Sequence, residues 1–420
     1  MKVLLLALSS AGYGETLIGL SLARQLAAAG HECRFVTEEM SVPLLRGSPF
    51  PFVPLQHGMG PLARLVVDEE VHDWRPDLIV LSDYFTYCGV FAKRFGLDPW
   101  FVDGYGIPVV PIDIWEWARA GFEVDVFCGK RMQVDDHILD YPAWLRPVPL
   151  CHTAGGDEPR SYPFSLATGD EAVTRRTRRH LREVLGIPPT DRLVMLALAR
   201  WQLPEYNDDN GNRVASLVPD LLVRCLAELP ERTHVIQVGD RMSGLELLDP
   251  ARAHHVPACS PSRFNVLLGS VDLFLGLNVG ATTLARAVLA GVSGVVVTNS
   301  YALRSPDEAA AAVETRGGRM DDRLAGWLRQ AMPLYPFRMW PLGFHSFLSP
   351  LLADNAYTEA FRQVELVDTA GIVRTVEREL YDPAAAEALA AGRRHFRRQL
   401  DSLPPTAEVF EKLAGSLGLR

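Results

Sequence analysis

The chain has few lysines, no C-x-x-C pair and no long apolar run; the last two absences, together with its negative net charge, each disfavour a class of function. Only four of its 42 basic residues are lysine, and its formal net charge of −9 disfavours nucleic acid or an anionic membrane as a general partner. The six cysteines are scattered without a C-x-x-C pair, so neither a zinc site nor a dithiol redox site is expected. No apolar run reaches the ~18 residues that a membrane span needs. We therefore expect a cytoplasmic protein with no metal, no membrane span and no nucleic-acid partner.

The first forty residues alternate between strand and helix patterns. Val3–Leu8 is an uninterrupted apolar run, typical of a buried parallel strand, and it leads into a glycine-rich turn instead of a signal-peptide cleavage site. Thr16–Ala29 then carries apolar residues at helical spacing and stops at Gly30. Cys33–Thr37 is a second predicted strand, so this segment predicts a βαβ unit.

The same alternation continues in two series that are separated by an irregular stretch rich in proline and glycine. The first series predicts strands over Phe52–Leu55, Leu78–Leu81 and Trp100–Val102, and helices over Leu62–His72 and Tyr87–Phe95. The second series predicts strands over Leu193–Leu198, His234–Val238, Leu273–Leu275 and Gly294–Val297, and helices over Glu171–Leu185, Leu217–Leu229 and Thr282–Ala290. Two parallel, helix-covered sheets follow from this order.

The rest of the chain predicts further helices and sets the expected domain limits. Helices are predicted within 307–331 and at 370–379, 383–399 and 407–416, with a late strand at Pro336–Pro341. The irregular stretch places the domain boundary within 145–170. We expect an N-terminal domain over 1–160, a C-terminal domain over 161–380, and terminal helices over 381–420 that pack back toward the N-terminal domain. The basic helix near 171–185 is interpreted as a solvated face, and the aromatic run near 335–347 as core packing.

Three segments carry a resemblance to a known family. Gly14–Arg24, followed by Gly30-His31-Glu32, resembles the opening of natural-product glycosyltransferases of the UDP-glycosyltransferase superfamily. Asp272–Thr283, followed by Ala290-Gly291-Val292, is similar to the donor motif of that superfamily, and Pro76–Asp83 resembles its strand with an aspartate at the tip.

The resemblance implies a fold and an activity. The fold would be α/β of the GT-B class, with two Rossmann-like, doubly wound parallel-sheet domains that face a cleft. The activity would be transfer of a sugar from a nucleotide sugar, bound by the C-terminal domain, to a small-molecule acceptor bound by the N-terminal domain. It also implies inversion at the sugar carbon, a place in natural-product or antibiotic biosynthesis, and no cofactor besides the nucleotide-sugar co-substrate. The resemblance does not decide whether the protein forms a homodimer.

The sequence departs from the family at the chemical positions. The family's catalytic histidine falls on Glu15, its donor-motif histidine on Asn278, and the glutamate of its donor helix on Arg286. These departures leave two other functions open: a nucleotide-sugar epimerase or hydrolase, and a nucleotide-binding partner without catalytic activity. A dinucleotide fingerprint is weaker, because Leu17 stands where its third glycine would be.

The candidate donor site lies between a strand and a helix N-terminus. Free N–H groups and the positive end of the helix dipole at this place suit a diphosphate, although a side chain that merely caps the helix is the alternative. Arg200, after the first strand of the second series, is a candidate partner of the β-phosphate, and Val256 is placed where the family's backbone reads the base. The candidate donor residues are Arg200, Val256, Asn278, Gly280, Ala281, Thr282 and Thr283.

The candidate catalytic groups are two carboxylates. Glu15 follows the loop of Gly12, Tyr13 and Gly14, which we expect near the cleft, and it is the candidate general base. Asp83 follows a neighbouring strand, and its charge would raise the pKa of Glu15, so that the two titrate as a unit. A glutamate placed only to match the helix dipole is the alternative for Glu15.

Overall fold

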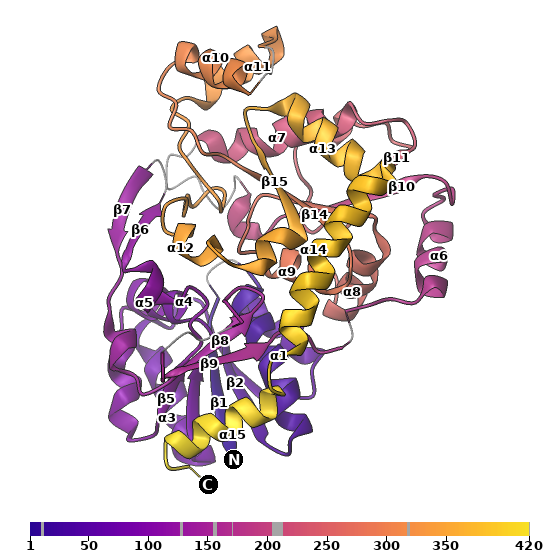
Figure 1. Ribbon diagram of the computed structural model, residues 1–420. Coiled ribbons are helices and arrows are strands. Elements are labelled where there is room, and N and C mark those ends of the chain that lie inside the picture. The colour runs from indigo at the N-terminus through magenta and orange to yellow at the C-terminus, as the bar shows by residue number, and fades with distance from the viewer. Residues whose placement is uncertain are drawn as a thin grey trace. The chain divides into compact units, whose positions relative to one another are not determined.

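The chain forms two compact units in the computed structural model, which describes residues 1–9, 12–126, 129–153, 158–169, 171–203, 213–316 and 320–419. Unit 1 comprises Met1–Phe122, Val134–Thr168 and Arg398–Arg420, and unit 2 comprises Glu123–Gln133 and Gly169–Arg397 (Figure 1). Neither unit is continuous in sequence, because unit 1 takes in the last helix and unit 2 takes in a short segment from the N-terminal part of the chain.

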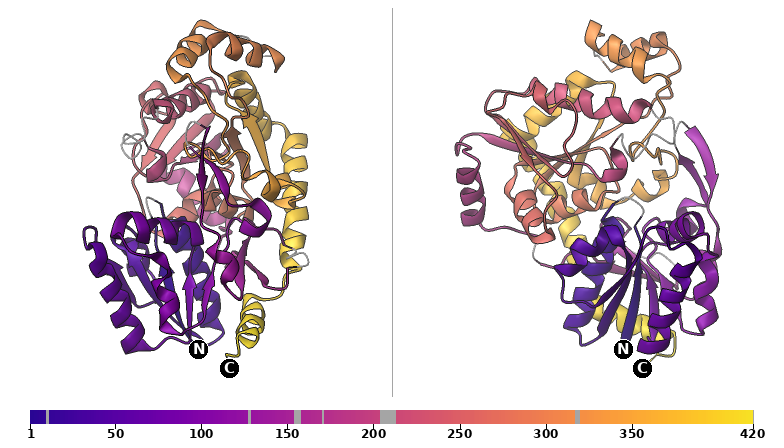
Figure 2. Two further views of the ribbon diagram at one scale, coloured as in Figure 1. Left: turned by 90° about the vertical axis from the view of Figure 1, so that its left-hand side faces the viewer. Right: turned by 180° about the vertical axis from the view of Figure 1, so that it is seen from behind.

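Unit 1 contains a five-stranded parallel sheet in the order β3-β2-β1-β4-β5. Its strands are β1 (Lys2–Ala7), β2 (Glu32–Glu38), β3 (Phe52–Leu55), β4 (Leu78–Leu81) and β5 (Val109–Pro111). Helices lie on both faces of this sheet (Figure 2), which explains why the side chains of Val3–Ala7 and Leu78–Leu81 are fully buried.

Short helices and one further strand pair complete unit 1. The helices are α1 (Gly14–Ala28), α2 (Val42–Arg46), α3 (Ala63–Trp74), α4 (Tyr84–Gly89), α5 (Trp117–Ala120) and α15 (Thr406–Ser416). A π-helical turn over Val90–Phe95 extends α4, and β8 (Trp144–Val148) pairs in parallel with β9 (Ser161–Ser165). α1 buries Ile18, Leu22 and Leu26, and the chain leaves it through Gly30 at a positive φ of 88°.

Unit 2 contains a six-stranded parallel sheet in the order β12-β11-β10-β13-β14-β15. Its strands are β10 (Arg192–Ala197), β11 (Thr233–Val238), β12 (Ala253–Val256), β13 (Leu273–Gly276), β14 (Ser293–Thr298) and β15 (Phe361–Glu365). Its helices are α6 (Arg175–Val184), α7 (Arg213–Ala227), α8 (Pro261–Ser270), α9 (Thr282–Leu289), α10 (Pro306–Thr315), α11 (Asp322–Ala331), α12 (Ser349–Leu352) and α13 (Thr369–Tyr381). Helix α14 (Pro383–Asp401) begins in unit 2 and ends in unit 1.

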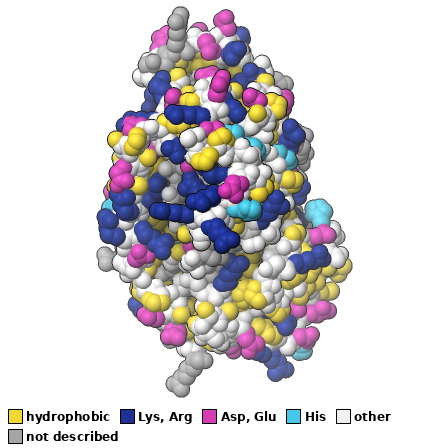
Figure 3. Space-filling view, turned by 90° about the vertical axis from the view of Figure 1, so that its right-hand side faces the viewer, with side chains coloured by type: hydrophobic (Ala, Val, Ile, Leu, Met, Phe, Trp, Pro, Cys, Tyr) yellow, Lys and Arg dark blue, Asp and Glu magenta, His cyan; other side chains and the backbone are white. Residues whose placement is uncertain are grey.

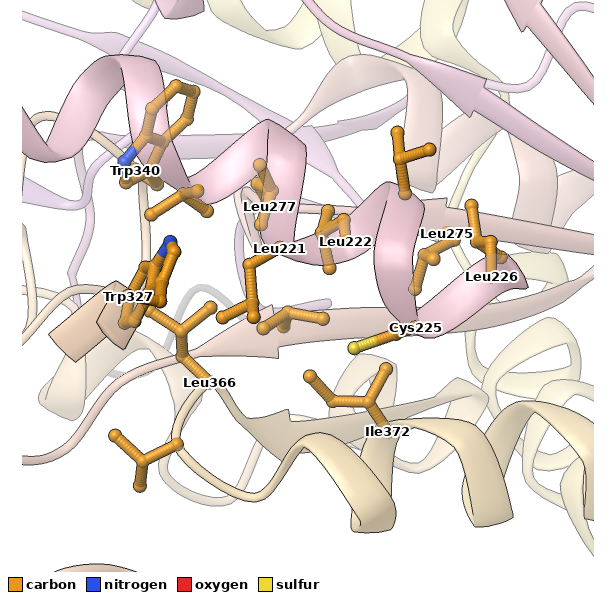
Figure 4. Packing of buried hydrophobic residues seen from close by; sticks show 14 of the residues in the cluster. Leu221, Leu222, Cys225, Leu226, Leu275, Leu277, Trp327, Trp340, Leu366 and Ile372 are labelled. Carbon is orange, nitrogen blue, oxygen red and sulfur yellow. The ribbon is translucent and has the colours of Figure 1, made fainter. Parts of the chain in front are cut away.

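The core of unit 2 lies between its sheet and α7, α11 and α13. Figure 4 shows Leu222 and Cys225 of α7 and Ile372 of α13 in this layer, all of them at most 3% exposed. Trp327 of α11 closes one side and donates its indole N–H to the carbonyl of Leu217 at 2.9 Å. Burial of these large apolar side chains stabilises the packing of the helices against the sheet.

A two-stranded antiparallel hairpin, β6 (Glu123–Val126) with β7 (Lys130–Gln133), belongs to unit 2 although its neighbours in sequence belong to unit 1. The carboxylate of Asp125 accepts hydrogen bonds from the backbone N–H groups of His345 (2.7 Å), Ser346 (3.2 Å) and Phe347 (2.9 Å). The carbonyl of Asp125 also accepts the N–H of Phe344 at 2.8 Å. One aspartate therefore fastens the hairpin to the turn over 344–347.

The basic helix of the sequence is α6, which begins at Arg175 because the Thr174 side chain caps it through the N–H of Thr177. Arg178 and Arg182 both pair with Asp272, the latter at 3.1 Å. Lysine and arginine side chains gather on the face of the molecule that carries α6 (Figure 3). Part of the helix is thus an exposed basic face, and part of it anchors the helix to the start of β13.

Two predicted strands are wrong. Trp100–Val102 lies in a 3-10 helix over Pro99–Tyr105, since the Asp98 side chain caps the N–H of Trp100 at 3.1 Å and Pro99 suits a first helical position. The fifth strand is β5, seven residues later in the chain. Residues 336–341 form no strand, because Phe337 and Met339 make only isolated bridges: Phe337 to Asn299, and Met339 to Asn278 and Gly343.

Candidate functional site

Each of the two large sheets has one point where the strand order reverses, and most of the candidate residues follow the strands that flank it. In unit 1 the reversal lies between β1 and β4, and in unit 2 it lies between β10 and β13. Loops at the carboxyl ends of the two strands that flank such a point form the usual ligand crevice of a doubly wound sheet. Glu15 and Asp83 follow β1 and β4, while Arg200 and Asn278 follow β10 and β13.

Asp83 is a buried cap. It is the N-cap residue of α4, and its Oδ2 accepts the N–H of Thr86 at 2.9 Å and the Thr86 hydroxyl at 2.5 Å. The side chain is 2% exposed, and Oδ1 is buried without a hydrogen-bond partner among the described residues. Burial, and secondarily the nearby Glu15, raise the pKa of Asp83 to about 7.

Glu15 is the partner that stays accessible. It is the second residue of α1, with Oε2 accepting the Ser9 hydroxyl at 2.9 Å and Oε1 within 3.4 Å of the Thr86 hydroxyl. Burial of the carboxyl raises its pKa, against the lowering effect of hydrogen bonds from its own backbone, Ser9 and Thr86. Glu15 is partly exposed as a residue whereas Asp83 is buried, so Glu15 is the more accessible member of the pair.

A third carboxylate, Glu38, completes the unit 1 cluster. It ends β2, is 2% exposed, forms an ion pair with Arg94, and accepts the N–H of Ser9 at 3.2 Å. Burial raises the pKa of Glu38, while the Arg94 guanidinium lowers it. The negative charge of this residue is therefore neutralised inside the unit, and Glu15 and Asp83 remain the uncompensated pair.

Sequence reasoning missed two residues that link these carboxyls: Thr86 contacts Asp83 and Glu15 through its hydroxyl, and Ser9 contacts Glu15 through its hydroxyl and Glu38 through its N–H. Ser9 follows the first apolar run and Thr86 stands three residues after Asp83, a spacing typical of a helix cap. In the loop before α1, the Gly12 carbonyl accepts the Ser9 hydroxyl, and Tyr13 is the N-cap residue of α1 without a side-chain cap. Gly14 is the first residue of the helix.

The candidate donor loop follows β13 in unit 2. Asn278 is 7% exposed, and its Oδ1 accepts the N–H of Gly280 at 2.8 Å, which closes a tight turn. The N-cap residue of α9 is Ala281, and no side chain among the described residues caps this helix. The interpretation of Asn278 or Thr282 as the cap is therefore wrong. The N–H groups of the first turn, which begins with Thr282 and Thr283, have no partner within the helix and no capping side chain.

A segment far along the chain braces this loop. The N–H of Val279 donates to the carbonyl of Arg338 at 3.0 Å, and the N–H of Trp340 donates to the carbonyl of Leu277 at 3.0 Å. The side-chain amide of Gln202 donates to the Trp340 carbonyl at 2.9 Å. The loop is thus held from both sides of the switch point, by contacts that no local sequence pattern reveals.

The other two candidate donor residues lie on the same carboxyl edge of the sheet. Arg200 pairs with Asp240 at 2.9 Å, and both side chains are exposed. Val256 ends β12, and its carbonyl accepts the N–H of Gly239 at 3.0 Å. Arg200 therefore stands beside the switch point, while Val256 lies two strands further out.

The described ranges hold neither a metal-binding cluster nor a helix suited to cross a membrane. In these ranges, no three histidine, cysteine or acidic side chains are placed to hold a metal ion together. No helix in the described part of the chain combines the length and the hydropathy that crossing a membrane requires.

Solved structures share the fold over the whole chain. The chain is similar to Anabaena HepE in complex with UDP-glucose, at 13% identity and a TM-score of 0.54, covering 100% of this chain and 99% of that one. It is similar to the glycosyltransferase VinC in complex with dTDP, at 14% identity and a TM-score of 0.55, covering 100% of both chains. It is also similar to spinosyn forosaminyltransferase SpnP, at 18% identity and a TM-score of 0.56, covering 100% and 99%.

These likenesses, together with the two parallel sheets, show that the fold is the expected α/β GT-B type. No curated protein matches the sequence. One family model matches residues 22–418, nearly the whole chain. The chain belongs to the family described as "Family of unknown function (DUF6365)".

Proposed function

We propose that the protein transfers a sugar from a nucleotide sugar to a small-molecule acceptor. The observation that carries the proposal is the uncapped N-terminus of α9, directly beyond β13 at the switch point of unit 2. N–H groups at such a terminus, with the positive end of the helix dipole, suit the diphosphate of a nucleotide sugar. Gly280 permits close approach of the backbone, and the hydroxyls of Thr282 and Thr283 add hydrogen-bond donors. The similarity to folds solved with UDP-glucose and dTDP supports the same choice of ligand.

The carboxyl pair of unit 1 supplies the proton chemistry in this proposal. An acceptor hydroxyl loses its proton to Glu15 as its oxygen attacks the sugar carbon, and the nucleoside diphosphate leaves with the electrons of the broken bond. Attack from the side opposite the leaving group inverts the sugar carbon. A base works best when its pKa lies near the working pH, and burial of the Glu15 carboxyl moves its pKa in that direction. Asp83 and Thr86 act as positioning residues, because they touch Glu15 or its hydrogen-bond partner and not the substrate.

The proposal assigns the acceptor to natural-product chemistry. Support comes from the fold shared with SpnP, a spinosyn forosaminyltransferase, and from the N-terminal segment that resembles natural-product glycosyltransferases. The nucleotide sugar is a co-substrate, and the proposed reaction uses no other cofactor and no metal. Neither the base of the nucleotide nor the sugar is part of the proposal.

Thermal shift with a panel of nucleoside diphosphates and nicotinamide dinucleotides tests the donor site. A diphosphate present at 100 times its Kd stabilises the folded protein by about 2.7 kcal/mol. The shift should be lost in Asn278→Ala, which removes the acceptor that closes the turn at Gly280. If no diphosphate shifts the transition, the proposed donor site is wrong. A shift with a nicotinamide dinucleotide alone would favour a dehydrogenase instead.

Turnover assays then separate the catalytic alternatives. Glu15→Gln should lower kcat by roughly 10²–10⁴-fold with the donor KM unchanged, since a positioned base contributes about that much. Glu39→Gln, an exposed glutamate in the same unit, is the matched control. Donor consumption without any acceptor would indicate an epimerase or hydrolase. Nucleotide binding without turnover, and indifferent to Glu15→Gln, would indicate a non-catalytic partner protein.

A further inference from the structure

A polar pocket of about 240 Å³ lies in unit 2 at the carboxyl ends of β14 and β15. Its walls come from these two strands, from the first turns of α13, and from the side chains of Arg316 and Arg338. Its lining is separate from the residues of the donor loop, but Arg338 connects the two places, because its carbonyl accepts the N–H of Val279.

The two acidic residues of the pocket are already engaged. The carboxylate of Glu365 accepts both the backbone N–H (2.9 Å) and the hydroxyl (2.6 Å) of Ser300, and it lies 3.4 Å from the Arg316 guanidinium. Asp368 is the N-cap residue of α13, and its Oδ1 accepts the N–H of Gly371 at 2.8 Å. Both carboxylates already bind groups of the protein, so we do not expect either of them to bind the ligand.

Arg338 is the charged residue of the pocket that has no ion-pair partner among the described residues. The side chain is partly buried, and one nitrogen donates to the Ser349 hydroxyl at 3.0 Å. Among the described residues, no carboxylate lies within ion-pair distance of this guanidinium. Burial lowers the pKa of Arg338, with Asp125 and Glu365 opposing from a greater distance. A guanidinium has five N–H donors, and one withdrawn from water is stabilised most by an oxyanion that accepts two of them.

We propose that this pocket binds the oxyanion group, carboxylate or phosphate, of a small molecule, with Arg338 as its main partner. The Thr375 hydroxyl and the Gln363 amide line the same pocket and add neutral donors. The pocket is smaller than the roughly 300–1,000 Å³ of a typical drug-sized ligand site, so it takes one small charged group and not a whole nucleotide. The proposal does not depend on the proposed glycosyl transfer.

Isothermal titration of the full chain with inorganic phosphate, and separately with malonate, tests the site. The ion that binds in wild type identifies whether the pocket prefers phosphate or carboxylate. Arg338→Gln should weaken its binding at least tenfold, and Arg338→Lys should weaken it less, because the charge stays while the paired donors are lost. Arg329→Gln removes an exposed arginine of the same unit and should change the Kd by less than twofold.

Two further variants keep the test decisive if Arg338→Gln folds poorly. Thr375→Val removes only one lining hydroxyl and should weaken anion binding severalfold, whereas Asn278→Ala should leave it unchanged. Binding lost in Asn278→Ala but kept in Arg338→Gln would place the anion on the donor loop and overturn the proposal. Equal losses in Arg338→Gln and Arg329→Gln would show nonspecific attraction and overturn it too, as would no binding of either ion to wild type.

Discussion

The buried carboxyl of Asp83 makes the stability of the protein depend on pH. Its pKa in the folded chain is about 7, against an ordinary value of 3.8. Between these two values the folded chain binds a proton that the unfolded chain has released, so the free energy of unfolding falls as pH rises. At about 1.4 kcal/mol per pKa unit, the whole loss is about 4 kcal/mol, of which about 3 kcal/mol falls between pH 5 and pH 8.

An asparagine in place of Asp83 should remove this loss. Asparagine does not ionise, and its carbonyl oxygen still accepts from the N–H and the hydroxyl of Thr86, as Oδ2 does in the native chain. The free energy of unfolding of Asp83→Asn, minus that of wild type, should therefore rise by about 3 kcal/mol from pH 5 to pH 8. Urea unfolding at several pH values, followed by tryptophan fluorescence, measures it. Asp98→Asn is the control, because it makes the same substitution at an exposed helix-capping aspartate of the same unit.

A flat difference between the two proteins would refute the reasoning. So would a difference of the opposite sign, with Asp83→Asn becoming relatively less stable as pH rises. Either result would mean that Asp83 is already ionised in the fold across this pH range, so that its pKa is not raised to about 7. Glu15 and Asp83 would then not titrate as a unit, whereas the raised pKa of Glu15, which burial causes, would be unaffected.

Three substitutions test other parts of the structure. Asp125→Ala removes the acceptor of three backbone N–H groups, so unit 2 should lose about 2–4 kcal/mol in urea unfolding; a loss no larger than that of the exposed Glu123→Ala would contradict this. Ala281→Asp should cap α9 and raise stability by about 1 kcal/mol, yet weaken nucleoside diphosphate binding by repulsion, measured by thermal shift and titration; unchanged binding would count against the donor loop. Gly19→Ala would bring a methyl group within 2.8 Å of the Ser82 hydroxyl and should cost about 1–3 kcal/mol, and an unchanged melting temperature would show that the helix shifts freely.

The buried parallel strands were predictable from sequence because they are continuous apolar runs. Val3–Ala7 of the first predicted run, Leu78–Leu81 and Leu273–Leu275 lie in strands of the two sheets. The edge strand β15 was missed, since Phe361–Glu365 alternates irregularly and three of its residues are polar or charged. β12 and the hairpin β6–β7 were missed for the same reason, as their apolar content is low.

The candidate sites were predictable in position but not in their contacts. Glu15 and Asp83 could be placed together because both follow strands that flank the switch point. Their link through Thr86 depends on how α4 begins, and the brace of the donor loop by Arg338 joins residues about sixty positions apart. The absence of a capping side chain on α9 was also hidden, because the cap position falls on Ala281 and the nearby Asn278 bonds to Gly280 instead.

The membership of α15 in unit 1 sets an order on folding during synthesis. His31 packs against Phe410 with ring centroids 5.3 Å apart, and the Tyr162 hydroxyl lies 3.0 Å from that of Ser416. The ribosome makes the sheet of unit 1 first and α15 only after all of unit 2. Although domains generally fold from the N-terminus as they emerge, unit 1 must keep the apolar surface that α15 covers exposed until synthesis is almost complete. The nascent chain is therefore most open to aggregation and to chaperone binding at the end that is made first.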